Sequence, residues 1–204
     1  MAHSAEAIEA EEILRGVLDR WKAGVDAHQP QQVASCFTED AIFQGLRPYS
    51  VGRQGVTDYT DEDYDAVTGV NLRGFFEVSR SAVAAMLSRE GGGHLVNIST
   101  SLVDHARSES PSALASLTEG GLNAVTKALA IEYADRGIRS NAVALGVIRT
   151  PMHPPSTYEA LAAAHPLGRL GEIDDVVEAI VYLENAPFVT GEILHVDGGQ
   201  SAGH

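Results

Sequence analysis

Three short apolar segments, each separated from the next by a helical pattern, constrain the fold of this chain most strongly. They are HLVNIST (94–100), IRSNAVALG (138–146) and EILHVDG (192–198). Apolar residues recur at helical spacing between them, over 112–136 and over 172–184. Strands separated by helices are joined by right-handed crossovers, which place them side by side and parallel. We therefore expect an α/β fold with a short parallel sheet.

The segment before the first strand is expected to be helical in two parts. A long helix should begin at Thr60, an N-cap with Asp63 three residues later, and run to about residue 89. Further upstream, apolar spacing predicts an amphipathic helix over 4–28, and AIFQGL (41–46) is typical of a strand. The character of the chain changes near residue 57, which is the expected domain boundary.

Composition excludes several classes of function. Acidic residues outnumber basic ones 28 to 14, for a net charge of −14, and such a surface repels nucleic acid and anionic lipid. No apolar run approaches the roughly 20 residues that cross a bilayer. The single cysteine, Cys36, cannot form an intrachain disulfide, and we expect a cytoplasmic protein. The eight histidines show no paired helical spacing, so no metal site is expected.

From about residue 61 to 204 the chain resembles the short-chain dehydrogenase/reductase family. The segments that carry the resemblance have the family's order and spacing. They are VNLRGFFEVSRSAVAAM, GGGHLVNIST, GGLNAVTKALAIEYADRGIRSNAVALGVIRTPM, HPLGRLGEIDDVVEAIVYL and FVTGEILHVDGGQS. The resemblance implies a Rossmann-like three-layer fold and descent from NAD(P)-dependent oxidoreductases. It covers only the C-terminal part of the family's fold.

Residues 1–57 resemble the opening of a different family, the SnoaL-like or NTF2-like fold. A long helix with an inward Trp21, followed by FTEDAIF and VGRQGV, is a common beginning there. The expected organisation is thus a chimera. A truncated SnoaL-like segment (1–57) precedes a truncated dehydrogenase-like domain (58–204) that lacks the N-terminal dinucleotide-binding half.

The glycine-rich turn that a dinucleotide requires is missing from the sequence. In this family it is a TGxxxGxG pattern after the first strand, where backbone N–H groups meet the pyrophosphate, and an NNAG-type segment comes later. Neither occurs here, and the glycine clusters at 91–93, 120–121 and 198–199 do not open a helix after a strand. We expect no cofactor, and NAD(P) only if a site survives or a partner completes it.

The resemblance assigns the family's catalytic positions to four residues of this chain. The family's Asn falls on Asn71 and its Ser on Thr100, whereas its Tyr and Lys fall on Ala115 and Glu119. A methyl group cannot transfer a proton, and a carboxylate in place of an ammonium would raise the pKa of a phenol rather than lower it. Asn71, Thr100 and Glu119 remain candidate catalytic residues.

Two further features bear on the site. The family's PGxxxT motif is LGVIRT here, and its Gly146 and Thr150 are candidate residual nicotinamide contacts, although a turn glycine and a cap before Pro151 explain them equally well. Glu119 could also form an acid/base pair with Asp104 or His105 if the loop after Thr100 folds back over the helix.

These patterns support three functional hypotheses, in order of preference. The first is a family member without redox catalysis that acts in binding or assembly. The second is a non-redox lyase, isomerase or cyclase acting on a small organic molecule. The third is an oxidoreductase completed by a partner subunit, and a fusion without selected function stays open. We expect a homodimer or tetramer through helices 60–89 and 112–136, and strand 94–100 needs a cover, from 41–46 or from a partner chain.

Overall fold

The computed structural model describes residues 59–89, 91–107 and 112–203, together with four isolated helical residues, Gly16, Asp19, Arg20 and Ala23. The chain divides into two compact units, Met1–Ile42 and Phe43–His204, and the three long described ranges all belong to the second unit. The expected strand over 41–46 and the expected boundary after residue 57 lie outside the described residues. The four isolated residues fall within the helix expected over 4–28.

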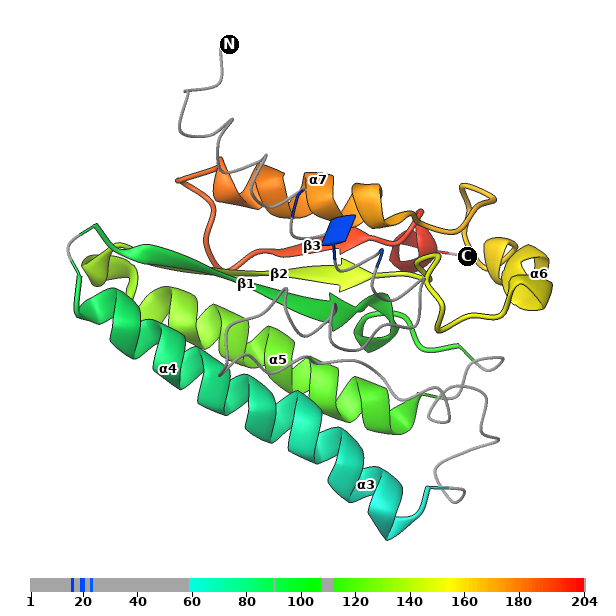
Figure 1. Ribbon diagram of the computed structural model, residues 1–204, viewed down its shortest axis with the longest axis horizontal. Coiled ribbons are helices and arrows are strands. Elements are labelled where there is room, and N and C mark those ends of the chain that lie inside the picture. The colour runs from blue at the N-terminus through cyan, green and yellow to red at the C-terminus, as the bar shows by residue number, and fades with distance from the viewer. Residues whose placement is uncertain are drawn as a thin grey trace. The chain divides into compact units, whose positions relative to one another are not determined.

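A three-stranded parallel sheet forms the centre of the second unit (Figure 1). Its strands are β1 (Gly93–Thr100), β2 (Ile138–Leu145) and β3 (Ile193–Val196), in the order β1-β2-β3. β1 and β2 pair along their whole length, from Gly93 opposite Ile138 to Thr100 opposite Leu145. The expected α/β fold with a short parallel sheet is confirmed. Among the described residues β1 pairs with β2 alone, and Ile98 near its end is 44% exposed.

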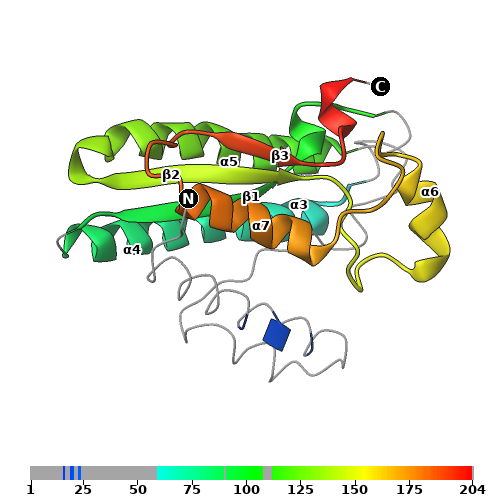
Figure 2. The same cartoon turned by 90° about the horizontal axis from the view of Figure 1, so that it is seen from above.

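Helices cover the two faces of the sheet (Figures 1 and 2). One face carries a helical run made of α3 (Asp61–Thr68), a π-helical turn (Gly69–Gly74) and α4 (Phe75–Leu87), and also α5 (Ala113–Glu132). The other face carries α7 (Ile173–Glu184). The small helix α6 (Tyr158–Ala162) lies in the connection between β2 and α7. None of the described helices is long and apolar enough to span a membrane.

The start of α3 has the expected capping pattern. The Thr60 hydroxyl accepts a hydrogen bond from the Asp63 backbone N–H at 3.2 Å, and the Thr60 N–H donates to the Asp63 carboxylate at 2.9 Å. Two donors at the helix start are thereby satisfied reciprocally. The N-cap prediction is confirmed.

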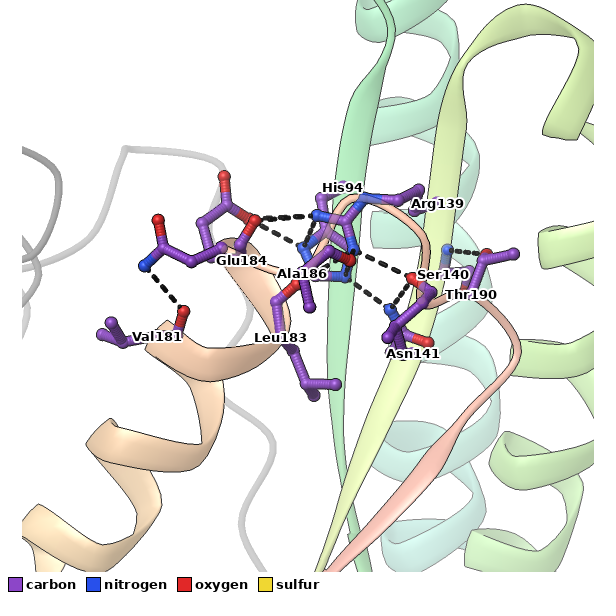
Figure 3. A network of polar contacts seen from close by, with 11 residues as sticks. His94, Arg139, Ser140, Asn141, Val181, Leu183, Glu184, Ala186 and Thr190 are labelled. Atoms are coloured by element: carbon purple, nitrogen blue, oxygen red, sulfur yellow. Dashed lines mark hydrogen bonds and ion pairs between the residues drawn. The ribbon is translucent and has the colours of Figure 1, made fainter. Parts of the chain in front are cut away.

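Arg139 joins the end of α7 to the N-terminal part of the sheet (Figure 3). Its guanidinium donates to the carbonyls of Leu183 (2.9 Å), Glu184 (3.1 Å) and Val189 (3.0 Å). The last carbonyls of a helix have no intrahelical partner, and a cation there is favoured by the helix dipole. Arg139 therefore holds α7 against β2.

Asn141 and His94 complete this network from neighbouring strands. The Asn141 carbonyl oxygen accepts from the Glu192 N–H at 2.9 Å, and its amide nitrogen lies 2.9 Å from His94 Nε2 and 3.0 Å from the Val189 oxygen. His94 Nδ1 lies 2.7 Å from the Glu184 carboxylate. Burial lowers the pKa of His94. The neutral ring can accept from Asn141 through Nε2 and donate to Glu184 through Nδ1.

Replacement of Asn141 tests how much the fold depends on this network. Asn141→Ala removes the acceptor of the Glu192 N–H at a fully buried side chain, and the Val189 oxygen keeps only its hydrogen bond from Arg139, so we expect the free energy of unfolding to fall by about 2 kcal/mol. Urea denaturation measures the change. Asn185→Ala, which removes one exposed hydrogen bond from the amide to the Val181 carbonyl at the end of α7, should cost about 1 kcal/mol or less. Equal losses of unfolding free energy in the two variants would show that the fold does not depend on the hydrogen bonds of Asn141.

Candidate functional site

Asn71 enters the candidate site from the π-helical turn, which a long regular helix does not contain. The side chain is 3% exposed and points to α5. Its amide nitrogen donates to the Thr118 hydroxyl and to Glu119 Oε1, both at 3.1 Å. π-Helical turns occur frequently at functional sites because they shift the residues on one face of a helix. The structure thus brings together Asn71 and Glu119, two of the three candidate catalytic residues.

Glu119 presents a buried carboxyl group on α5. The residue is 8% exposed, Oε1 accepts from Asn71, and Oε2 has no hydrogen-bond partner among the described residues. Burial raises the pKa of Glu119 to about 7, because the charged form loses its hydration without gaining a cation. The group is therefore poised between its neutral and ionised forms at neutral pH.

Ala115 lies one turn before Glu119 on the same side of α5 and is 6% exposed. Residues four apart on a helix are neighbours, so the position implied for the family's tyrosine does adjoin Glu119. A methyl group occupies it. Thr118 lies between the two. Its hydroxyl donates to the Leu114 carbonyl at 3.0 Å and accepts a hydrogen bond from the Asn71 amide. Sequence reasoning missed Thr118, although its position three residues after Ala115 places it on this side of the helix.

Thr100 is the last residue of β1, and its side chain bonds to the turn that follows directly after it. Its hydroxyl accepts from the Leu102 N–H at 3.3 Å and begins the short turn Ser101–Val103. That turn does lie against α5, since the Ser116 hydroxyl donates to the Leu102 carbonyl at 3.2 Å. Thr100 makes no hydrogen bond to Asn71 or Glu119, the two candidates that the structure joins.

Asp104 pairs with a residue that the sequence did not suggest. Its carboxylate lies 2.9 Å from Nε2 of His195 on β3, and neither Asp104 nor His105 is hydrogen-bonded to Glu119. The turn Ser101–Val103 brings Asp104 to the β3 side of α5, where His195 is in reach. The expected acid/base pair with Glu119 is not formed. The described residues contain no cluster of three or more His, Cys, Asp or Glu that could hold a metal ion.

Gly146 and Thr150 come after β2, and packing accounts for the glycine and a local hydrogen bond for the threonine. A Cβ at position 146 would lie 2.8 Å from the Asp197 Cα and 2.8 Å from His165 Nε2, so only glycine fits. The Thr150 hydroxyl accepts from the Met152 N–H at 3.4 Å, next to Pro151. A role of either residue in nicotinamide contact stays a prediction.

Comparison with known proteins places residues 45–201 in a family described as enoyl-(acyl carrier protein) reductase. The glucose and ribitol dehydrogenase homolog of Oryza sativa subsp. japonica is 35% identical over 156 residues, which are 72% of this chain and 52% of that protein. Carbonyl reductase family member 4 of Xenopus laevis is 38% identical over 180 residues, 85% of this chain and 75% of that protein.

A solved structure shares the fold as well. A gluconate 5-dehydrogenase from Burkholderia cenocepacia, in complex with NADP and tartrate, superposes with a TM-score of 0.67 at 28% identity, over 80% of this chain and 63% of that one. The chain spans about half the length of several of the curated relatives that it matches. The family match begins at residue 45, inside the segment expected to be SnoaL-like, and that second resemblance stays a prediction. Together with the parallel sheet and its helices, these matches establish that the chain belongs to the short-chain dehydrogenase/reductase family.

Proposed function

We propose that this protein has lost the nicotinamide-dependent hydride transfer of its family and acts in binding or assembly. The observation that carries the proposal is the buried pair of Asn71 and Glu119, with Ala115 one turn earlier. The family resemblance implies an ammonium and a phenol at these positions of α5. A carboxyl and a methyl group stand there instead, so the helix offers neither the acid nor the group that lowers its pKa.

The described residues lack the cation and the glycine-rich turn with which the family binds NAD(P). Its relatives include a structure with NADP bound, but in the described part of the chain Oε2 of Glu119 is an unpartnered acceptor where the resemblance implies a cation. The glycine clusters also stand in the wrong places. Gly91–Gly93 lead into β1, Gly120 and Gly121 lie inside α5, and Gly198 and Gly199 come after β3. Over residues 59–89, 91–107 and 112–203, no cluster lies between a strand and the first turn of an α-helix.

A second candidate function is general acid/base catalysis of a non-redox reaction by Glu119. It is supported by the pKa of about 7, since a proton-transfer group works best when its pKa lies near the working pH. A third hypothesis is an oxidoreductase completed by a partner subunit. It is supported by the structure of a similar protein that contains NADP. The burial of Oε2 supports the binding role over both, because a substrate has no access to that oxygen.

We extend the proposal to the organisation of the chain. Residues 1–57 would be the opening of a SnoaL-like or NTF2-like domain, joined to a family member without its N-terminal half. The sequence pattern alone supports this chimeric origin. The outer edge of β1 would then need a cover from the N-terminal segment or from a second copy.

Homo-oligomerisation belongs to the same proposal. Large apolar side chains are exposed on both long helices, among them Phe76 (59%) on α4 and Leu117 (60%) and Ile131 (79%) on α5. Exposed apolar surface on neighbouring helices favours association with another subunit. A homodimer or tetramer through these helices would cover it.

A thermal melt with nucleotides tests the loss of the cofactor. We expect a cooperative melt that NAD, NADH, NADP and NADPH all leave unchanged. A nucleotide that binds only the folded state at about 100 times its dissociation constant would add about 2.7 kcal/mol, a rise of a few degrees. A family member known to bind NADPH serves as the positive control. An upward shift with any of the four would contradict the proposal.

Substitution of Glu119 tests the raised pKa. The folded pKa of about 7 lies above the ordinary value of 4.5, so the stabilising effect of the proton is complete below pH 4.5 and is lost as pH rises through 7. Glu119→Gln keeps the shape without the charge. The free energy of unfolding of this variant should equal that of the natural protein near pH 4.5. At about pH 8 it should be higher than that of the natural protein by about 3 kcal/mol.

Denaturant titrations at several pH values measure this difference. Glu132→Gln, which removes an exposed carboxylate from the same helix, is the matched control. If Glu119→Gln and Glu132→Gln have the same pH profile, Glu119 is not held in a desolvated site. The second candidate function would then lose its support.

Light scattering after gel filtration tests the oligomer. Phe76→Glu combined with Ile131→Glu places charges on both long helices, and we expect the molar mass to fall toward that of the monomer. Leu167→Glu changes an exposed apolar residue outside those helices (70% exposed) and should leave the mass unchanged. A natural protein that is already monomeric would overturn this part of the proposal.

A further inference from the structure

We propose that His94 makes the end of α7 acid-sensitive, so that protonation of its ring detaches this end, and the segment leading to β3, from the sheet. The ring belongs to β1, its side chain is only 5% exposed, and it contacts both α7 and β2 (Figure 3). In the described part of the chain, its charged neighbours are Glu184 of α7 and Arg139 of β2. Neither Asn71 nor Glu119 takes part in this contact.

Asn141 determines which nitrogen of the His94 ring carries the hydrogen. The Asn141 carbonyl oxygen accepts from the Glu192 N–H at 2.9 Å, so its amide nitrogen is the group that lies 2.9 Å from His94 Nε2. An amide N–H is a donor, and Nε2 can accept from it only while it carries no hydrogen. The hydrogen of the neutral ring is then on Nδ1, which donates to the Glu184 carboxylate at 2.7 Å. The contact therefore requires the neutral ring.

A second proton on the ring opposes this arrangement in two ways. It would place an N–H on Nε2 directly against the Asn141 amide hydrogens, so that two donors would face each other. It would also create a cation 3.0 Å from the Arg139 guanidinium, in a place almost closed to water. The Glu184 carboxylate favours the charged ring, but it is 56% exposed. Burial, aided by Arg139, outweighs it and lowers the pKa of His94.

The sign of this pKa shift means that acid weakens the contact. The folded pKa of His94 lies below the ordinary value of 6.5, so protonation has little effect on the contact above pH 6.5. As pH falls below 6.5, the detached state takes up a proton that the closed contact excludes. One proton is involved, so the equilibrium constant for opening rises by at most about tenfold per pH unit until the folded pKa is reached.

Opening would change the surface at this end of the molecule. Leu183 is fully buried in the core beside Val143, whereas Tyr182 next to it and Phe188 in the following segment are 56% and 103% exposed. Detachment of the end of α7 would add Leu183 to these two exposed side chains. Acid would thereby enlarge the apolar surface here without unfolding the rest of the sheet.

Amide hydrogen exchange of the full chain, followed by NMR from about pH 7.5 to about pH 4.5, tests the proposal. Each rate is divided into the rate of an unfolded peptide at the same pH to give a protection factor. We expect the protection of the Glu192 N–H, which bonds to Asn141, to fall progressively below pH 6.5. The Gly146 N–H, which bonds to the Val196 oxygen at the other end of the sheet, should keep its protection.

Two variants separate the ring from its partner on α7. His94→Gln cannot titrate and keeps an amide that can bond to Asn141, so the protection of the Glu192 N–H should no longer depend on pH. Glu184→Gln removes the carboxylate that favours the charged ring. The pKa of His94 should therefore fall further, and opening should shift to lower pH.

His105→Gln changes a half-buried ring after β1, and Glu178→Gln changes an exposed carboxylate of α7. These matched controls should show the pH profile of the natural protein. The NMR titration of the His94 ring in the natural protein keeps the test valid if a variant folds poorly, because the ring should titrate below pH 6.5 together with the loss of protection.

Several results would overturn the proposal. One is a His94 ring that titrates at 6.5 or above, and another is protection of the Glu192 N–H that does not change with pH. An equal loss at the Gly146 N–H would indicate global unfolding instead of local opening. An unchanged pH profile in His94→Gln would exclude the ring as the cause. None of these results depends on whether nucleotides bind.

Discussion

The arrangement of the sheet and α7 depends most on the guanidinium of Arg139. Arg139 lies on the central strand, and its side chain bonds to the end of α7. It donates to carbonyls in the last turn of α7 and to the segment beyond it, and β2, which carries it, pairs on both sides. With a side chain only 16% exposed, Arg139 satisfies acceptors that would otherwise be buried without partners. Asn141 and His94 extend the contact to the next connection and the next strand. The N-terminal end of the sheet is thereby fixed, and the opposite end is left to the loops and to the candidate site.

Much of this architecture could be predicted from the sequence, because each strand is a continuous apolar run bounded by helical periodicity. The capping of α3 was also predictable, since Thr60 and Asp63 are three residues apart. The π-helical turn at Asn71 was not, because hydrophobic spacing does not distinguish it from a regular helix. The pair of Asp104 and His195 was equally hidden, since 91 residues separate its members and only the sheet order brings them together.

The candidate site shows why a retained residue and a retained function are different things. Gly146 persists where a nicotinamide contact was expected, yet the backbone of Asp197 and the ring of His165 leave no space for a side chain there. Asn71 persists too, and its amide donates to a carboxyl that the family resemblance does not imply. Each residue can be explained by its neighbours in this chain. The placement of Glu119 could be anticipated from the sequence, but its raised pKa depends on packing that only the fold defines.

The π-helical turn also makes the Asn71–Glu119 pair sensitive to chain length. Each residue advances a helix by about 100°, so deleting Leu72 or Arg73 would turn everything before it by that angle relative to α4. Asn71 would then face away from α5 although no side chain had been exchanged.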